Sequence, residues 1–387
     1  MNVLFLSISL GSGHIRAAEA LRKYILLKYP TSKTLIVDTF KYINPLIHTA
    51  IVDGYLNIVK CAPQIYGSLY RMSEHGKNID RMSRVVSNLM APKIHKLIQS
   101  FKPSIIVCTH PFPLQMIAYL KKHYSLDIPA IAVVTDFVNH PFWFQDNIDA
   151  YIVAHDYIKK DMIECKIPEK RIFTYGIPIA PEFLKSTSKI EARKKLSLKN
   201  TLTVLLMGGS LGIGDIEIVF KSFAKCKRDI QIIAVAGKNK TLEKRLNNLA
   251  ASFSMPVKIF GYTDNIPMLM DAADLIVTKP GGMTISEALA KKLPALIISP
   301  IPGQEERNEQ FLINSGAAVR IYKNTNIDSL LCQVYDNRLR YKQMKEIAGA
   351  LAKPDAGNNI LCLIEKLVSD NEKGYSNIRL MPFNLLM

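Results

Sequence analysis

A histidine lies in a glycine-rich turn close to the start of the chain. Residues Leu10 to His14 read LGSGH, directly after the apolar run Val3 to Ser7 and before a helical pattern that begins near Ile15. Ligands of open α/β sheets bind at the carboxyl ends of the strands, and an imidazole with a near-neutral pKa suits a general base there. The same pattern fits a histidine that only hydrogen-bonds a helix terminus. Without a third glycine, the turn gives little support to NAD binding.

Two further glycine-rich segments each join an apolar run to a helical pattern. Gly208 to Gly214 read GGSLGIG, and Lys279 to Ala288 read KPGGMTISEA. Glycines let a phosphate approach the backbone, and a helix N-terminus adds roughly half a positive charge. Neither segment contains the Gly-Lys-Ser/Thr of a nucleoside-triphosphate loop. The Gly208 to Gly214 segment is therefore a candidate phosphate site, with a purely structural tight turn as the alternative.

Polar side chains near the second of these segments each allow two interpretations. Thr284 and Glu287 have the spacing of a capping box, which needs no ligand, whereas the Glu287 carboxylate also suits a ribose hydroxyl. Gln304, Glu305 and Asn308 follow the next apolar run. They suit either sugar hydroxyls or a solvated helix start, and the local sequence does not separate these alternatives.

Short apolar runs alternate with amphipathic stretches along most of the chain, which is typical of strands and helices in a parallel sheet. In the first half the expected strands are Val3–Ser7, Thr34–Val37, Ser104–Cys108, Ala130–Val134 and Tyr151–Val153. In the second half they are Leu202–Met207, Ile230–Ala236, Val257–Phe260, Asp274–Thr278, Ala295–Ser299 and Ala318–Ile321. The expected fold class is therefore α/β, with two Rossmann-like parallel-sheet domains.

The two domains join near Gly176 to Ser188, a segment that is rich in proline and then in lysine and serine. We expect an N-terminal domain over residues 1–180 and a C-terminal domain over residues 181–387. The last helices are candidates for packing back on the first domain. The segment from Thr39 to Phe101 mixes aromatic, basic and apolar residues and is too long for one simple crossover.

Composition limits the class of protein. The 387-residue chain has six cysteines without a C-x-x-C pair, which argues against a zinc site or a disulfide framework. Its net charge of +17 is spread over both halves and favours anionic partners: a phosphorylated molecule, an anionic membrane or nucleic acid. No nucleic-acid module accompanies the charge, so nucleic acid is not an expected partner. The longest uncharged stretch, Pro103 to Leu120, contains three prolines and a histidine, so no membrane-spanning segment is expected.

The ordered set of motifs is more specific than any one of them. In chain order these are GSGH, VTDF with a following HPFW, GIPIAPEF, GGS, AVAGKN, GYTDNI, KPGGMTISEALA and PGQEERN. Over roughly Met1 to Leu367 the chain resembles the family of monogalactosyldiacylglycerol synthases and processive diacylglycerol glucosyltransferases. That family is related to the N-acetylglucosaminyltransferase of lipid II synthesis. The resemblance implies the GT-B fold, in which two Rossmann-like domains face across a cleft, and an inverting, metal-independent transfer from a UDP-sugar.

The resemblance also assigns roles to single residues. His14 falls on the family histidine proposed to deprotonate the lipid hydroxyl. The implied donor-binding residues are Gly208, Gly209, Ser210, Lys238, Asn239, Gly261, Tyr262, Gly281, Gly282, Met283, Thr284, Glu287, Gln304, Glu305 and Asn308. The family linker usually supplies an arginine near the diphosphate, whereas this chain has Ala180. Either Lys238 or Lys279 replaces that cation, or donor binding is weaker than usual.

The expected function is transfer of a hexose from a UDP-sugar to diacylglycerol or a glycosyldiacylglycerol. The alternatives are a polyprenyl-linked peptidoglycan precursor as acceptor, and a catalytically weak UDP-sugar sensor. No metal and no cofactor is expected, because the chain contains no Asp-x-Asp pair. We expect a peripheral protein on the cytoplasmic face of the cell membrane. Its contact with anionic phospholipid would involve Arg81, Arg84, Lys93 and Lys96.

Overall fold

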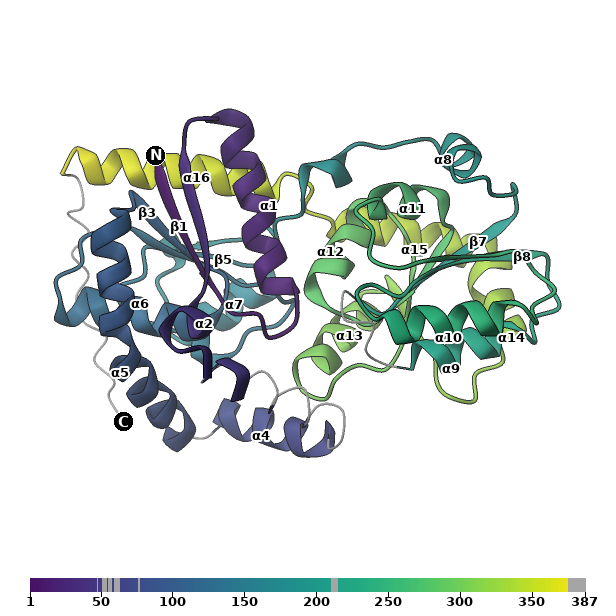
Figure 1. Ribbon diagram of the computed structural model, residues 1–387, viewed down its shortest axis with the longest axis horizontal. Helices are drawn as coiled ribbons and strands as arrows, with labels where there is room; N and C mark the ends of the chain where they lie inside the picture. Colours follow the sequence, from purple (N-terminus) through teal and green to yellow (C-terminus); the bar gives the residue numbers. More distant parts are fainter. Residues whose placement is uncertain are drawn as a thin grey trace. The chain divides into compact units, whose positions relative to one another are not determined.

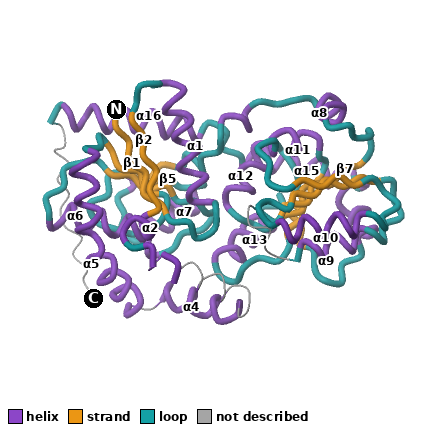
Figure 2. Tube along the Cα trace, viewed as in Figure 1, coloured by secondary structure: helices purple, strands orange, loops and turns teal. Residues whose placement is uncertain are grey.

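The computed structural model of this chain describes residues 1–46, 48–50, 54, 58, 63–75, 77–209 and 215–374, but not the side chains of residues 63, 66, 69, 73–75 and 77–87. The chain divides into two compact units. Unit 1 comprises Met1–Ala180, Pro302–Gln304 and the chain from Lys353 onward, and unit 2 comprises Pro181–Ile301 and Glu305–Ala352. Each unit is built around one parallel sheet with helices on both faces (Figures 1 and 2).

The sheet of unit 1 has six parallel strands in the order β2-β1-β3-β4-β5-β6. Their bounds are β1 Asn2–Ser7, β2 Lys33–Asp38, β3 Ile105–Cys108, β4 Ala130–Val133, β5 Ala150–Ile152 and β6 Ile172–Phe173. The central strands are buried on both faces, which is why they are continuous apolar runs in the sequence. The five strands predicted in this half all form, and the two-residue β6 was not predicted.

The helices of unit 1 enclose its sheet. They are α1 Gly13–Lys28, α2 Thr39–Ile43, α4 Pro63–His75, α5 Lys77–Phe101, α6 Pro111–His123, α7 Asp156–Glu164 and α16 Ala356–Glu372, with 3₁₀ turns η1 Pro141–Trp143 and η2 Glu169–Arg171. Phe5 of β1, Ile25 of α1 and Ile360 of α16 belong to one buried core cluster. A Cβ on Gly357 would lie 2.1 Å from the Tyr24 ring, so the glycine permits the close approach of α16 to α1.

The last helix of the chain therefore belongs to unit 1, whereas the helix before it stays in unit 2. The second unit ends at Ala352, and the place of α16 in unit 1 agrees with the expectation that the end of the chain packs back on the first domain. The apolar side chains Leu361, Leu363 and Ile364 explain the placement, because they are buried against the sheet of unit 1.

The sheet of unit 2 also has six parallel strands, in the order β12-β11-β10-β7-β8-β9. Its strands are β7 Leu202–Met207, β8 Ile230–Val235, β9 Val257–Phe260, β10 Leu275–Thr278, β11 Ala295–Ile297 and β12 Ala318–Arg320. The helical elements are η3 Pro181–Leu184, α8 Lys189–Lys195, α9 Ile216–Phe223, α10 Lys240–Ala250, α11 Ile266–Ala272, α12 Gly282–Ala290, α13 Gln304–Asn314, α14 Ile327–Leu331, the π-helical turn η4 Cys332–Asp336 and α15 Arg338–Leu351. All six strands predicted in this half are present.

Each sheet has one point where the strand order reverses. In unit 1 this switch point lies between β1 and β3, and in unit 2 it lies between β7 and β10. The loops that follow two such strands separate at the carboxyl edge and leave a crevice for a ligand. The topology therefore brings His14, which follows β1, beside the residues that follow β3. It also brings the Gly208 loop beside the Gly281 loop.

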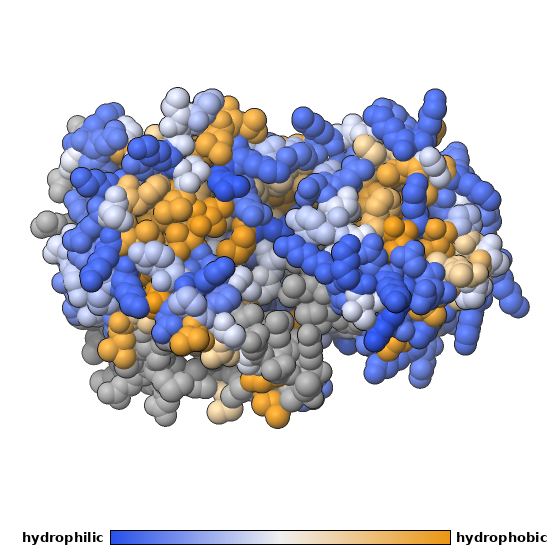
Figure 3. Space-filling view, viewed as in Figure 1, coloured by the Kyte–Doolittle hydropathy of each residue, from blue (hydrophilic) through white to orange (hydrophobic). Residues whose placement is uncertain are grey.

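Hydrophilic side chains are spread over the visible face of both units, with smaller apolar patches between them (Figure 3). None of the described helices combines the length and the apolar character that crossing a bilayer requires.

Candidate functional site

His14 is the second residue of α1 and stands at the switch point of unit 1. Gly11 in the preceding turn has a φ of +77°, a left-handed conformation that favours glycine. This conformation lets the chain turn sharply from β1 into α1. The sequence Leu10 to His14 thus serves to bring one imidazole to the carboxyl edge of the sheet.

Two groups that lie just after the neighbouring strands β3 and β4 contact the same nitrogen of His14. Its Nδ1 lies 2.9 Å from the Thr109 carbonyl oxygen and 2.8 Å from the Thr135 hydroxyl oxygen. A carbonyl oxygen only accepts hydrogen bonds, so Nδ1 must carry the hydrogen and donate it. In the neutral ring, Nε2 then holds the lone pair. The arrangement leaves Nε2 as the nitrogen that can accept a proton.

The surroundings keep the His14 ring uncharged. Desolvation by the surrounding protein lowers the pKa of the partly buried imidazole to about 4, although the hydrogen bond to the Thr109 carbonyl acts in the opposite direction. The His110 ring packs edge-on against it, with centroids 4.6 Å apart. Burial, and then repulsion by the positive charge that a protonated His14 would carry, hold the pKa of His110 well below its usual range. The near-neutral pKa expected for His14 is therefore wrong, because the local sequence does not reveal this burial.

Three other histidines of unit 1 cap helices. The Nδ1 atoms of His110, His140 and His155 accept backbone N–H groups two residues later, at 3.3, 3.2 and 3.1 Å respectively. The sequence analysis missed this role. The signal was the His-Pro-Phe triplet that occurs at both His110 and His140, because proline favours the first position of a helix. These rings serve as caps, whereas His14 reaches the switch point.

Asp136, in the VTDF segment, is buried next to Thr135 in the segment that follows β4. Its carboxylate accepts a hydrogen bond from the Gln304 amide. Gln304 was predicted to bind the donor in the second domain, but it belongs to unit 1 together with Pro302 and Gly303. Its amide nitrogen is thus engaged with a carboxylate of unit 1.

In unit 2, two loops meet at the switch point. Gly208 and Gly209 follow β7, and Gly209 has a φ of +68°. Ser210 lies outside the described residues. Gly281 is the N-cap of α12, so the backbone N–H groups of Gly282, Met283 and Thr284 stand in its first turn without an intrahelical acceptor. Such a terminus favours an anion.

The capping-box interpretation of Glu287 is wrong. The N-cap of α12 is Gly281, three residues earlier than the interpretation requires, and it makes no side-chain cap bond. Thr284 is therefore the third residue of the helix, and Glu287 lies in its second turn with 1% of its surface exposed. The extended conformation of Gly281 starts the helix early. Ribose binding by Glu287 stays a prediction.

The other predicted donor residues near α12 support the loop itself. Glu305 accepts a hydrogen bond from the Ile301 backbone at 2.7 Å and pairs with the Lys279 ammonium at 3.1 Å. The buried Asn308 donates to the Pro280 carbonyl at 3.0 Å. These contacts tie the Lys279–Gly282 loop to α13. Lys279 is thus already paired, which makes it less suited to replace the linker arginine that is absent at Ala180.

A second group of predicted donor-binding residues follows the ends of β8 and β9. Asn239 caps α10 by accepting the Leu242 N–H at 2.9 Å, and the Lys238 ammonium lies 5.2 Å from the centre of the Tyr262 ring. Tyr262 is 58% exposed. A Cβ on Gly261 would lie 2.7 Å from a carboxylate oxygen of Glu243, so a larger residue at that position would displace the Glu243 side chain. The exposed tyrosine ring beside a lysine is suited to stacking on a base.

The predicted membrane residues have different outcomes. The side chains of Arg81 and Arg84 lie outside the described residues. The Lys93 ammonium donates to the Ile43 carbonyl at 2.6 Å and so closes the end of α2. Lys96 is exposed. Lys93 is also exposed, although its ammonium is held by this hydrogen bond, and membrane contact by this segment stays a prediction.

Comparison with known proteins agrees with the motifs. Residues 14–179 match the family model of monogalactosyldiacylglycerol (MGDG) synthase, and residues 203–360 match the glycosyltransferase family 28 C-terminal domain. A processive diacylglycerol beta-glucosyltransferase of Bacillus cereus is 31% identical over 372 residues, which are 95% of this chain and 94% of that protein. A protein of the same name from Bacillus anthracis is 30% identical over 372 residues, again 95% of this chain and 94% of that protein.

The chain belongs to the family of MGDG synthases and processive diacylglycerol glucosyltransferases. The predicted resemblance is thus confirmed. Solved structures similar to this family member include Acinetobacter baumannii MurG, with a TM-score of 0.56 at 15% identity over 94% of this chain and 99% of that one. Another is the S. aureus MnaA–UDP complex, with a TM-score of 0.58 at 12% identity over 99% and 100%. These likenesses confirm the predicted two-domain α/β fold of the GT-B type.

Proposed function

We propose that this chain transfers a hexose from a UDP-sugar to the hydroxyl of diacylglycerol or of a glycosyldiacylglycerol, with His14 as the general base. The relatives that match it over nearly its whole length are named processive diacylglycerol beta-glucosyltransferases. The observation that carries the role of His14 is its Nδ1 contact with the Thr109 carbonyl, since this contact leaves Nε2 to accept a proton.

The reaction is a displacement at the anomeric carbon. The acceptor hydroxyl gives its proton to Nε2 of His14, and its oxygen forms a bond to the anomeric carbon. The bond from that carbon to the diphosphate oxygen breaks, and its electron pair leaves with UDP. Attack on the face opposite the leaving group inverts the configuration. The imidazolium then returns its proton to solvent.

The departing UDP gains negative charge that the protein must stabilise. Our proposal assigns this task to the backbone N–H groups at the start of α12 and to the Gly208 loop, which the topology brings together. Lys238 beside Tyr262 supplies a nearby cation in the same unit. Since the sequence has no Asp-x-Asp pair, we propose that the transfer needs no divalent metal.

The acceptor is a lipid, so we propose that the protein works as a peripheral enzyme on the cytoplasmic face of the cell membrane. The net charge of +17 supports contact with an anionic surface. Lys96, Arg81 and Arg84 are the proposed contacts in unit 1. Vesicle binding that rises with phosphatidylglycerol content and falls with salt would agree with this proposal.

Lipid-extract turnover tests the proposed reaction. The purified protein receives radiolabelled UDP-glucose, UDP-galactose or UDP-N-acetylglucosamine, together with either diacylglycerol or a polyprenyl-linked peptidoglycan precursor. We expect label in glycosyldiacylglycerol for at least one donor. Label only in the polyprenyl product would instead support the alternative acceptor. UDP-sugar binding without turnover on any acceptor would support a sensor.

A further inference from the structure

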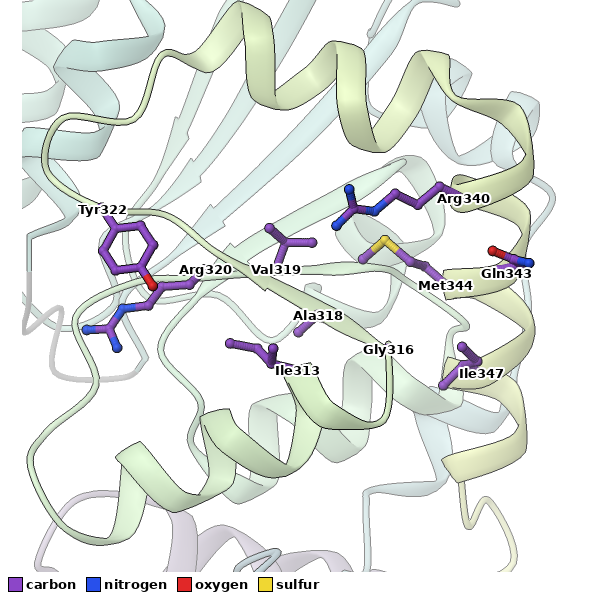
Figure 4. Close-up of a pocket in the computed structure, with 10 residues that line it drawn as sticks. All are labelled: Ile313, Gly316, Ala318, Val319, Arg320, Tyr322, Arg340, Gln343, Met344 and Ile347. Atoms are coloured by element: carbon purple, nitrogen blue, oxygen red, sulfur yellow. The ribbon is translucent and has the colours of Figure 1, made fainter.

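A groove of about 430 Å³ lies in unit 2, away from the two loops at the switch point. The end of α13, the edge strand β12 and the helix α15 form its walls (Figure 4). Its volume falls within the range of roughly 300–1,000 Å³ that is usual for ligand sites. Gly316 has a φ of +79°, and a Cβ there would lie 3.0 Å from Ile347, so the glycine keeps the groove open.

Charge and apolar surface are separated along this groove. On α15, Arg340, Met344 and Ile347 are spaced by four and three residues and so share one face of the helix. The Arg340 side chain points from α15 toward Val319 (Figure 4). Seven residues of helix cover about 10 Å, so the face changes from cationic to apolar over that distance. Ile313 of α13 adds a further apolar side chain to the lining.

The two arginines of the groove differ in their partners. Arg320 pairs with the buried Glu309 at 2.8 Å, and its guanidinium carbon lies 5.0 Å from the centre of the Tyr322 ring. Arg340, by contrast, makes no side-chain hydrogen bond or ion pair with any residue that the structure describes. Arg320 is therefore fixed in place, and Arg340 has its planar fork available for a ligand.

Two lysines of α15 have partners outside the groove. Lys342 pairs with Glu346 at 3.7 Å, and the Lys345 ammonium lies 5.8 Å from the centre of the Tyr341 ring. Lys342 differs from Arg340 by two helical positions, which is about half a turn. The chain thus offers Lys342 as a matched control, because it carries the same charge on the same helix outside the groove.

Large apolar side chains are exposed beside the groove. Ile313 is 38% exposed and Tyr322 is 64% exposed, and both line it. Leu339, next to Arg340 in the chain, is 66% exposed. Apolar surface next to a free guanidinium fits a molecule that has an anionic head and a hydrocarbon tail.

We propose that this groove binds one anionic phospholipid, whose phosphate contacts Arg340 and whose acyl chain lies along Met344, Ile347 and Ile313. The site is distinct from the donor and acceptor sites of the proposed function and gives unit 2 its own contact with the bilayer. A strand of another chain, paired with the edge of β12, is a less suitable occupant of the groove than a phospholipid. The strand has three residues, and such a short edge offers few backbone hydrogen bonds.

A fluorescent reporter in the full chain tests the proposal without any measurement of activity. The variant Ile313→Trp places an indole at the apolar part of the groove, and the single native tryptophan, Trp143, is subtracted as background with the parent protein. Vesicles contain equal parts of phosphatidylglycerol and chain-brominated phosphatidylcholine. We expect the bromine atoms to quench the new signal. No quenching beyond the background would overturn the proposal.

Two further variants locate the contact. In the reporter background, Arg340→Gln should weaken vesicle binding about fivefold, which corresponds to one basic residue near an anionic surface. Lys342→Gln should change it less than twofold. An equal loss in both variants would show diffuse charge attraction and contradict a groove. Circular dichroism checks that both variants fold.

The apolar part of the site separates a phospholipid from a free anion. Ile347→Asn should weaken binding to the vesicles, because it removes apolar contact with the acyl chain. If Ile347→Asn had no effect and inorganic phosphate protected Arg340 from guanidine-specific labelling, the groove would bind only the phosphate. If the protein dimerised as its concentration rose, and this prevented quenching of the reporter by the brominated acyl chains, the groove would instead bind a second copy of this protein. Either result refutes the lipid site.

Discussion

The protonation state of His14 gives the most quantitative prediction. Desolvation lowers the pKa of its imidazole to about 4 in the structure without substrates. The quantity kcat/KM reports the ionisation of the free enzyme, so this ratio and not kcat is the one to measure against pH. A base must be unprotonated to act. The rate should therefore follow the unprotonated fraction of His14.

The expected values differ clearly from those of an ordinary histidine. With a pKa of about 4, about 90% of His14 is unprotonated at pH 5, whereas a pKa of about 6.5 leaves about 3% unprotonated. Between pH 7 and pH 5, kcat/KM should then fall by less than about 20%, compared with about 25-fold for the ordinary value. The acid limb should have its midpoint near pH 4 to 5.

The assay uses diacylglycerol in mixed micelles of neutral detergent, so that lipid charge stays constant across the pH range. The variant His110→Asn is the control. Asparagine at position 110 can still cap the helix, and the replacement of His110 removes the second titratable ring at the site. Near-UV circular dichroism at each pH confirms that the protein is folded. An acid limb centred near pH 6.5 in both proteins would refute the proposed environment of His14.

The remaining predictions concern the donor, the metal and stability. If the Glu287 carboxylate binds ribose, Glu287→Gln should weaken UDP binding roughly tenfold or more in calorimetric titration, because hydrogen bonds to charged groups contribute about 1.5–3 kcal/mol. Ser286→Ala, on the same helix, is the control. An unchanged UDP affinity of Glu287→Gln would exclude ribose binding. EDTA should leave the transfer rate unchanged, and a strict need for magnesium or manganese would contradict the proposed mechanism. Below pH 6.5 the unfolded chain binds more protons than the folded one at His14, so the free energy of unfolding should fall by up to about 3 kcal/mol between pH 6.5 and pH 4. Urea denaturation should show a smaller fall in His14→Ala, and equal slopes in both proteins would contradict the lowered pKa.

The strands were predictable because parallel strands covered on both faces must be apolar along their whole length. This signal is local, and it predicted eleven of the twelve strands in the part of the chain that the structure describes. The exception, Ile172–Phe173, has only two residues and is too short for a pattern. The juxtaposition of the glycine loops also follows from strand order, since both precede helices beside a switch point.

The contacts that define the site were not predictable in the same way. Thr135 lies 121 positions from His14 and Thr109 lies 95 positions away, so no local pattern joins them. The pKa of His14 depends on this packing. Glu287 was ambiguous because a capping box depends on where the helix starts, and Gly281 starts it earlier than the spacing suggested. Gln304 shows a third cause, since the short segment Pro302–Gln304 belongs to unit 1 although the residues on both sides of it belong to unit 2.

The loss of His14 tests the central claim most directly. His14→Ala should reduce kcat at least about a hundredfold, within the usual effect of removing a general base, and should leave the Kd of UDP unchanged. His155→Asn is the control, because asparagine also caps a helix, and His155, which caps α7 and contacts the Phe137 carbonyl at 3.0 Å, has no role in the proposed reaction. Near-normal turnover by a folded His14→Ala protein would contradict the account.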